Sequence, residues 1–135
     1  MAFVSRFRNS IRVRYGEVDA QGVVFNAHYM AYVDDTLERF LGEVGGLRDL
    51  GWDMMLKKIE IEWQGSVGNT DVIDVDMAPT RWGNTSWELG FAGSFDGELV
   101  FTATVLYVSV RLGTSETMAT PAEVVEAFGP AVDGP

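Results

Sequence analysis

The chain has 135 residues, 47% of them hydrophobic, and this composition predicts one packed domain over residues 1–135 rather than a disordered segment. A formal net charge of −10 argues against a nucleic-acid partner, because binding to a phosphate backbone depends on clustered lysine and arginine. With no cysteine and one histidine, the chain also lacks the residues for disulfides, thiolate nucleophiles and the usual zinc sites.

The distribution of apolar residues gives an expectation about the compartment. No stretch approaches the roughly 18 apolar residues of a membrane span, and the first residues lack the apolar run of a signal peptide. We therefore expect a cytoplasmic protein without a membrane partner.

The first predicted element is a strand over Arg6 to Arg14. Its arginines occupy even positions and its apolar residues odd ones, which is the period of a half-buried strand. These arginines also form the one local basic cluster of an acidic chain. The segment Gly16 to Gly22 combines glycines with acidic residues that tolerate turns, so a loop should follow the strand.

An amphipathic helix is predicted next, from about Ala27 to Val44. Apolar residues recur there at spacings of three and four, and the acidic residues lie off that stripe. Asn26 is a favoured N-cap residue, and Gly45-Gly46 can take the positive φ of a helix C-cap.

Alternating patterns then predict four more strands, near residues 58–63, 73–77, 87–95 and 99–110, with a hairpin at Asp96-Gly97 and a short helix over Pro121 to Phe128. The fold class is therefore α+β, with one long central helix wrapped by a five-stranded antiparallel sheet. Residues 99–110 are apolar at nearly every position. Because one helix cannot cover both faces of a sheet, we expect self-association as a homodimer or homotetramer.

A sequence motif links the first strand to the helix. The segment Val13 to Tyr29 reads VRYGEVDAQGVVFNAHY, and its centre is an Asp-x-x-Gly-x-Val pattern at Asp19. It resembles the signature of the 4-hydroxybenzoyl-CoA thioesterase-like branch of the hotdog family. Ile59 to Trp63 and Gly83 to Trp87 are also similar, so the resemblance covers about Val4 to Arg111. It implies a hotdog fold and an enzyme that hydrolyses acyl-CoA to free acid and CoA without a metal or an organic cofactor.

The resemblance also implies roles for individual residues. Asp19 would act as nucleophile or as general base, and the backbone N–H of Asn26 would donate to the oxyanion at the helix N-terminus. Many relatives have histidine where this chain has Asn26, so an imidazole contribution is absent, and His28 is not expected to replace it. The residues expected to bind substrate are Gly22, Val24, Phe25, His28, Tyr29 and Arg81.

Other interpretations stay open at this level. An aspartate such as Asp19 can simply hydrogen-bond its own turn, and Glu17 is expected to be a solvated or structural acid. An acyl-carrier-protein thioesterase is disfavoured because carrier proteins are acidic too. A hotdog module that binds acyl-CoA without cleaving it is the third alternative. A serine hydrolase is disfavoured by the lack of a G-x-S-x-G motif.

Overall fold

The computed structural model describes residues 3–135. In chain order its elements are β1 (Phe7–Arg12), a 3-10 turn (Tyr15–Glu17), α1 (His28–Val44), a second 3-10 turn (Leu47–Leu50), β2 (Trp52–Trp63), β3 (Val72–Trp82), β4 (Ser86–Phe95), β5 (Glu98–Arg111) and α2 (Ala122–Phe128). Within this part of the chain no helix is long and apolar enough to cross a membrane.

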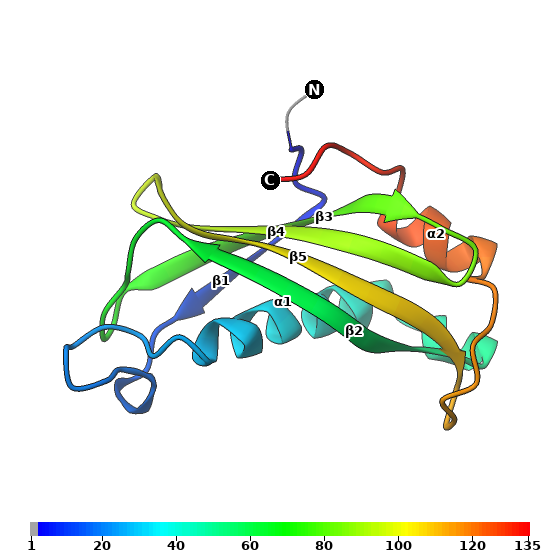
Figure 1. Ribbon diagram of the computed structural model, residues 1–135, viewed down its shortest axis with the longest axis horizontal. Coiled ribbons are helices and arrows are strands. Elements are labelled where there is room, and N and C mark those ends of the chain that lie inside the picture. The colour runs from blue at the N-terminus through cyan, green and yellow to red at the C-terminus, as the bar shows by residue number, and fades with distance from the viewer. Residues whose placement is uncertain (1–2) are drawn as a thin grey trace.

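The five strands form one antiparallel sheet in the order β1-β3-β4-β5-β2 (Figure 1). Hairpins connect β3 to β4 and β4 to β5. The second hairpin turns at Asp96-Gly97 as predicted, where both residues have positive φ, of 53° and 82°. β2 lies at the far edge beside β5, so the connection from β2 to β3 crosses the width of the sheet (Figure 1).

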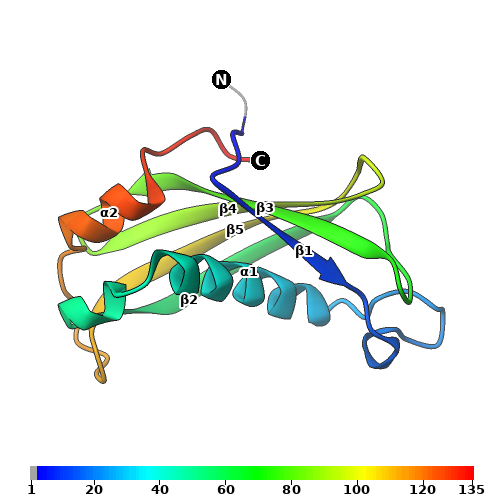
Figure 2. The same cartoon turned by 180° about the vertical axis from the view of Figure 1, so that it is seen from behind.

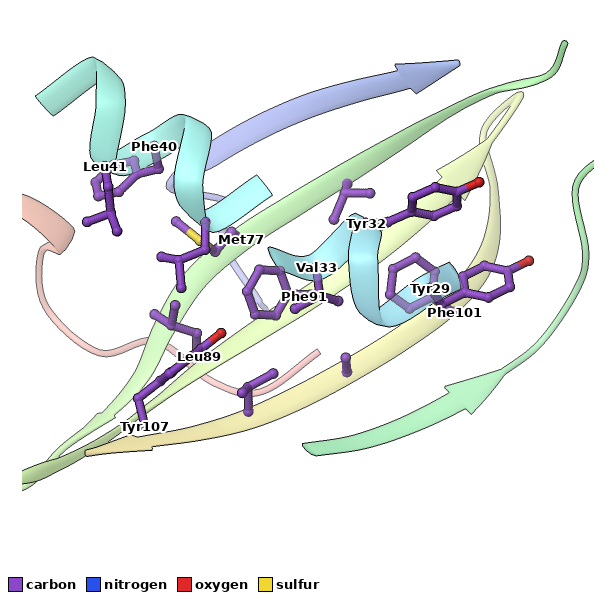
Figure 3. Close-up of a cluster of buried hydrophobic side chains, with 14 of the residues drawn as sticks. Tyr29, Tyr32, Val33, Phe40, Leu41, Met77, Leu89, Phe91, Phe101 and Tyr107 are labelled. Atoms are coloured by element: carbon purple, nitrogen blue, oxygen red, sulfur yellow. The ribbon is translucent and has the colours of Figure 1, made fainter. Parts of the chain in front are cut away.

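α1 packs along one face of the curved sheet, which confirms the predicted helix wrapped by five antiparallel strands (Figure 2). Its apolar stripe faces inward-pointing side chains of β3, β4 and β5, and aromatic rings fill much of the space between them (Figure 3). The core residues labelled in that view are Tyr29, Tyr32, Val33, Phe40, Leu41, Met77, Leu89, Phe91, Phe101 and Tyr107. A core of this size and density supplies the main stabilisation of the domain.

Several boundaries differ from the sequence prediction. β3, for example, continues to Trp82, five residues beyond its predicted end. The N-cap of α1 is Ala27 rather than Asn26, and no side chain caps this end of the helix. β2 begins at Trp52, several residues before its predicted start, and its register shifts between Leu56 and Lys58. That bulge changes the parity of the inward-facing residues, so a search for one uninterrupted alternation finds only the second half of the strand.

Between residues 3 and 135, no helix or strand covers the face of the sheet opposite α1 (Figure 1), although Phe3 and Pro135 lie against it at Gly90. Thr102, Thr104 and Leu106 of β5 point to that face and are half-buried by their neighbours within the sheet. Coverage of this face by a second subunit therefore stays a prediction.

Candidate active site

The predicted loop between β1 and α1 is a short two-stranded ribbon at one end of the sheet. The Asp19 N–H donates to the carbonyl of Val23 at 2.8 Å, and the Phe25 N–H donates to the carbonyl of Glu17 at 2.9 Å. Gly22 closes the turn with a φ of 80°, a conformation that favours glycine. The ribbon is fastened to the rest of the domain through Val24, whose N–H donates to the carbonyl of Val67 at 2.9 Å.

Asp19 lies half-exposed at the turn of this ribbon. Its Oδ1 accepts a hydrogen bond from the N–H of Gln21 at 2.8 Å, which is the local bond expected of an ordinary turn aspartate. Its Oδ2 accepts no hydrogen bond from any residue between 3 and 135. One carboxylate oxygen is thus fixed, and the other remains available to a ligand or to water.

The second half of the ribbon leads directly into α1. The carbonyl of Phe25 accepts from the His28 N–H at 2.9 Å, and the carbonyl of Asn26 accepts from the Tyr29 N–H at 3.3 Å. The N–H groups of Asn26 and Ala27 have no acceptor within the described chain. Unpaired donors at the positive end of a 17-residue helix favour a negative charge, which is what an oxyanion site requires.

Glu17 connects the ribbon to the residues before it and to α1. Its Oε1 accepts from the Arg14 N–H at 2.8 Å and from the hydroxyl of Tyr32 at 3.0 Å. Burial of Tyr32, reinforced by its bond to this carboxylate, raises the pKa of the phenol well above its ordinary value. Glu17 therefore ties the segment before Asp19 to the first turns of α1.

The other predicted site residues fall into three groups. Val24 and Tyr29 are buried core residues, so they anchor the ribbon and the start of α1 in the core. Phe25 is exposed, and the ring of His28 packs edge-on against it with centroids 6.2 Å apart. Arg81 lies near the opposite end of β3, where it pairs with Glu88 at 3.1 Å.

Within one chain, Arg81 is about 30 Å along β3 from the end of the sheet that holds the ribbon, given a rise of about 3.3 Å per residue. The structure therefore holds Gly22, Val24 and Phe25 on the same ribbon as Asp19, places His28 and Tyr29 in the first turn of α1, and leaves Arg81 apart. No group of three histidine, aspartate or glutamate side chains in residues 3–135 is placed to hold a metal ion.

Sequence reasoning missed two supports of this site. Tyr32 reads as one more apolar-stripe residue of the helix, yet its hydroxyl reaches Glu17. The segment Val67-Gly68 pairs with Val23 and Val24 across more than forty residues of chain. Neither contact has a local sequence signal, because both depend on how distant segments meet in the fold.

Known proteins share this architecture. A crystal structure of a hypothetical protein from Aquifex aeolicus superposes with a TM-score of 0.83 at 24% identity, covering 91% of this chain and 99% of the other. The 1,4-dihydroxy-2-naphthoyl-CoA thioesterase from Synechocystis gives 0.79 at 18% identity, with 90% and 94% covered. A probable thioesterase from Escherichia coli gives 0.80 at 17% identity, with 90% and 96% covered. These likenesses confirm the hotdog fold.

The sequence itself gives the family. The model of the thioesterase-like superfamily matches residues 13–128, a span that begins just before the ribbon and ends at the last residue of α2. The match includes Asp19, the N-terminus of α1 and all the strands after it. The chain therefore belongs to the thioesterase-like superfamily.

Proposed function

We propose that the protein hydrolyses an acyl-CoA thioester to a free acid and CoA, with Asp19 as the reacting carboxylate. The observation that carries this proposal is the ribbon geometry, in which an aspartate with one free oxygen and a helix end with unpaired N–H groups belong to the same short segment. Relatives by fold include CoA thioesterases that act on aromatic acyl groups, among them the Synechocystis protein and a gentisyl-coenzyme A thioesterase.

The two ends of the ribbon have different roles in the reaction: the Asn26 end stabilises the oxyanion, and the Asp19 end supplies the carboxylate. As the thioester carbonyl is attacked, negative charge develops on its oxygen, and the backbone N–H of Asn26 stabilises that charge together with the positive end of α1. The C–S bond then breaks, and the departing thiolate of CoA takes up a proton. Because the donor is main chain, an asparagine here serves as well as the histidine of many relatives.

Asp19 has two candidate roles. As a nucleophile it forms an acyl anhydride that water cleaves in a second step, and as a general base it deprotonates the attacking water directly. Single turnover in H₂¹⁸O tests for the nucleophilic route. Attack of water on the Asp19 carbon of the anhydride releases acid without ¹⁸O in the first turnover and leaves the label in the Asp19 carboxylate, a result that general-base catalysis cannot give because it always labels the acid.

Self-association through the edge strand β2 is part of the same proposal. β2 has a strand neighbour on one side only, and Met55, Leu56 and Trp63 are exposed along it. An exposed edge of twelve residues with apolar side chains is a ready surface for pairing with a second copy. Sedimentation of the wild type and of Leu56→Lys tests this, since a lysine at the edge should shift the protein toward the monomer.

Two alternative functions can each be distinguished from acyl-CoA hydrolysis by experiment. A carrier-protein thioesterase would cleave the acyl-carrier substrate faster than the matched acyl-CoA, and a binding module would retain acyl-CoA without turnover. A panel of aromatic and aliphatic acyl-CoA substrates, assayed by release of free thiol beside matched carrier substrates, tests the proposal. Turnover of at least one acyl-CoA in preference to its carrier counterpart is the expected result, and binding without turnover across the panel would contradict it.

A further inference from the structure

A second concave site lies along the outer edge of β1, next to the candidate active site but separate from it. The cavity has a volume of about 540 Å³ and lies between β1, the adjoining turn and α1. Figure 2 shows β1 crossing in front of the sheet and ending beside the loop that leads to α1. Its lining comprises Ser10, Ile11, Arg12, Val13, Arg14, Tyr15, Asp35, Arg39, Asn69 and Thr70.

Three of these side chains are exposed arginines without an ion-pair partner. Arg12, Arg14 and Arg39 form no salt bridge and no side-chain hydrogen bond with residues 3–135. Other basic side chains of the chain are engaged with carboxylates, at Arg8, Arg48, Lys58, Arg81 and Arg111. In a chain with a net charge of −10, three free guanidinium groups around one cavity are a local reversal of charge.

The rest of the lining fits a phosphorylated, aromatic ligand. Asp35, which accepts a hydrogen bond from the side-chain amide of Asn9 at 2.9 Å, is the one carboxylate of the lining, and three arginines against it leave the cavity with a net positive charge. Tyr15 is 80% exposed, which is unusual for so large an aromatic side chain, and it offers a face on which a base can stack. Arginines beside a free aromatic ring are the chemistry that recognises a nucleotide.

We propose that this cavity binds the phosphorylated adenosine portion of CoA, with Arg12, Arg14 and Arg39 on its phosphates and Tyr15 against its base. The inference rests on the proposed function. It adds a binding site for the nucleotide end of the substrate, whose thioester end would lie at Asp19. Arg14 precedes Asp19 by five residues, so their Cα atoms lie within about 18 Å at an extension of 3.6 Å per residue. The pantetheine arm of CoA bridges a gap of this order between phosphate and thioester.

The site also offers a reason why an acidic protein can take an acidic substrate. The four charges carried by the phosphates of CoA are repelled by most of the surface, and the arginine cavity gives them one favourable place. An acidic carrier protein would need a broad basic surface instead, whereas this cavity is small and its surroundings are acidic.

The test uses the full-length protein with all three arginines changed, Arg12→Gln, Arg14→Gln and Arg39→Gln, because exposed polar substitutions should leave the fold intact. Arg111→Gln is the matched control, since it removes the same charge at the opposite end of the sheet. Calorimetric titration with free CoA, 3′-dephospho-CoA and pantetheine measures binding without turnover. Initial rates on an acyl-CoA and on the same acyl group carried by pantetheine measure catalysis.

The expected loss in CoA affinity is about tenfold for each arginine removed, and the KM for acyl-CoA should rise in parallel while kcat changes little. The pantetheine thioester lacks the adenosine phosphates, so its kcat/KM should be the same in both proteins. Tyr15→Ala should weaken CoA binding without affecting pantetheine, and the control should match the wild type throughout.

Three results would overturn the inference. One is wild-type CoA affinity in the triple variant. Another is an equal loss on the CoA and pantetheine thioesters, which would place the arginines in the chemistry or the fold. The third is a loss confined to acyl-carrier substrates. A wild type that binds CoA through these arginines but cleaves no thioester would leave this site standing and refute the proposed function instead.

Discussion

The hydroxyl of Tyr32 donates a hydrogen bond to Glu17 Oε1 at 3.0 Å, and this contact joins the second turn of α1 to the segment that leads into Asp19. Glu17 also accepts from the Arg14 N–H, and its carbonyl accepts from the Phe25 N–H. A single glutamate therefore holds the start of the ribbon, its return strand and the helix in one arrangement. A site that must hold a carboxylate close to backbone donors needs such support from the residues around it.

Tyr32→Phe removes this bond and keeps the ring. We expect the free energy of unfolding to fall by about 1.5 kcal/mol, because the lost hydrogen bond involves a charged acceptor in a partly buried position. Turnover should fall as well, since the ribbon that carries Asp19 loses an anchor. Urea denaturation and steady-state rates measure the two effects. Unchanged values of both would show that Glu17 does not depend on the tyrosine.

Tyr107→Phe is the same chemical change, but we expect it to leave the stability of the fold unchanged or to raise it. The Tyr107 hydroxyl is buried and has no hydrogen-bond partner in the described structure. Burial, with smaller contributions from the carboxylates of Asp34 and Glu38, raises the pKa of this phenol. Removing an unsatisfied buried hydroxyl should be neutral or stabilise the fold by up to about 1 kcal/mol. A clear loss of stability would mean that the hydroxyl has a partner in solution, such as a bound water.

Gly93→Ala should destabilise the core. Gly93 of β4 lies directly opposite Phe101 of β5, and a Cβ built at this glycine would overlap the Phe101 ring. Phe101 cannot move freely because it packs against Tyr29, with ring centroids 5.2 Å apart. We expect a cost of about 1–3 kcal/mol from overpacking.

The matched control is Gly42→Ala on α1, where a Cβ would meet nothing within 4 Å. Alanine has the higher helix propensity, so this variant should be more stable by about 0.5–1 kcal/mol. Thermal unfolding of the two variants checks both signs. Equal effects would indicate that the close approach of β4 and β5 is absent in solution.

Arg8→Gln should change the response to acid. Arg8 binds Asp76 through Nε at 2.9 Å and Nη2 at 2.8 Å. Burial alone would raise the Asp76 pKa, but the hydrogen bonds from Arg8 and Ser5 and the charge of Arg8 together hold it below its ordinary 3.8. A lowered carboxyl pKa stabilises the fold above the ordinary value, and this contribution disappears as the pH falls through the lowered one.

The stability difference between wild type and Arg8→Gln should therefore be about 0.5–1 kcal/mol at pH 7, because the arginine of the pair is solvent-exposed, and it should shrink steadily below about pH 3.8. Chemical denaturation of both proteins at pH 7, 5, 4 and 3 measures this difference in the free energy of unfolding. A difference that stays constant to pH 3 would show that the ion pair with Asp76 is not its source.

Much of the fold could be predicted because local patterns and tertiary packing agree along most of this chain. The stripe of α1, the alternation in β3 and β4 and the Asp96-Gly97 turn all coincide with the structure. The first half of β2 was missed because the bulge at Lys57 reverses which residues face inward. The N-cap prediction was wrong because the chain enters α1 through tight turns in which the N–H groups of His28, Tyr29 and Met30 are bonded by main-chain carbonyls, so no side chain caps this end and the cap position falls at Ala27.

The site was predictable only where it is continuous in sequence. Asp19, Gly22 and the start of α1 are encoded in one segment, and main-chain hydrogen bonds fold that segment into the ribbon. The supports from Tyr32 and from Val67 come from other elements and could not be read locally. For the same reason the sequence could not show that Arg81, expected to bind substrate, lies at the far end of the sheet from Asp19 within one chain.

The most direct test of the central claim compares Asp19→Asn with Asp71→Asn on the acyl-CoA substrate that the wild type cleaves fastest. Both aspartates accept a main-chain N–H at 2.8 Å near the same end of the sheet, from Gln21 and from Gly68, and an asparagine can preserve either bond. If Asp19 carries the chemistry, its variant should lose about 10²-fold or more in kcat at unchanged stability, while Asp71→Asn keeps nearly full activity. Full turnover by a folded Asp19→Asn protein would contradict the account.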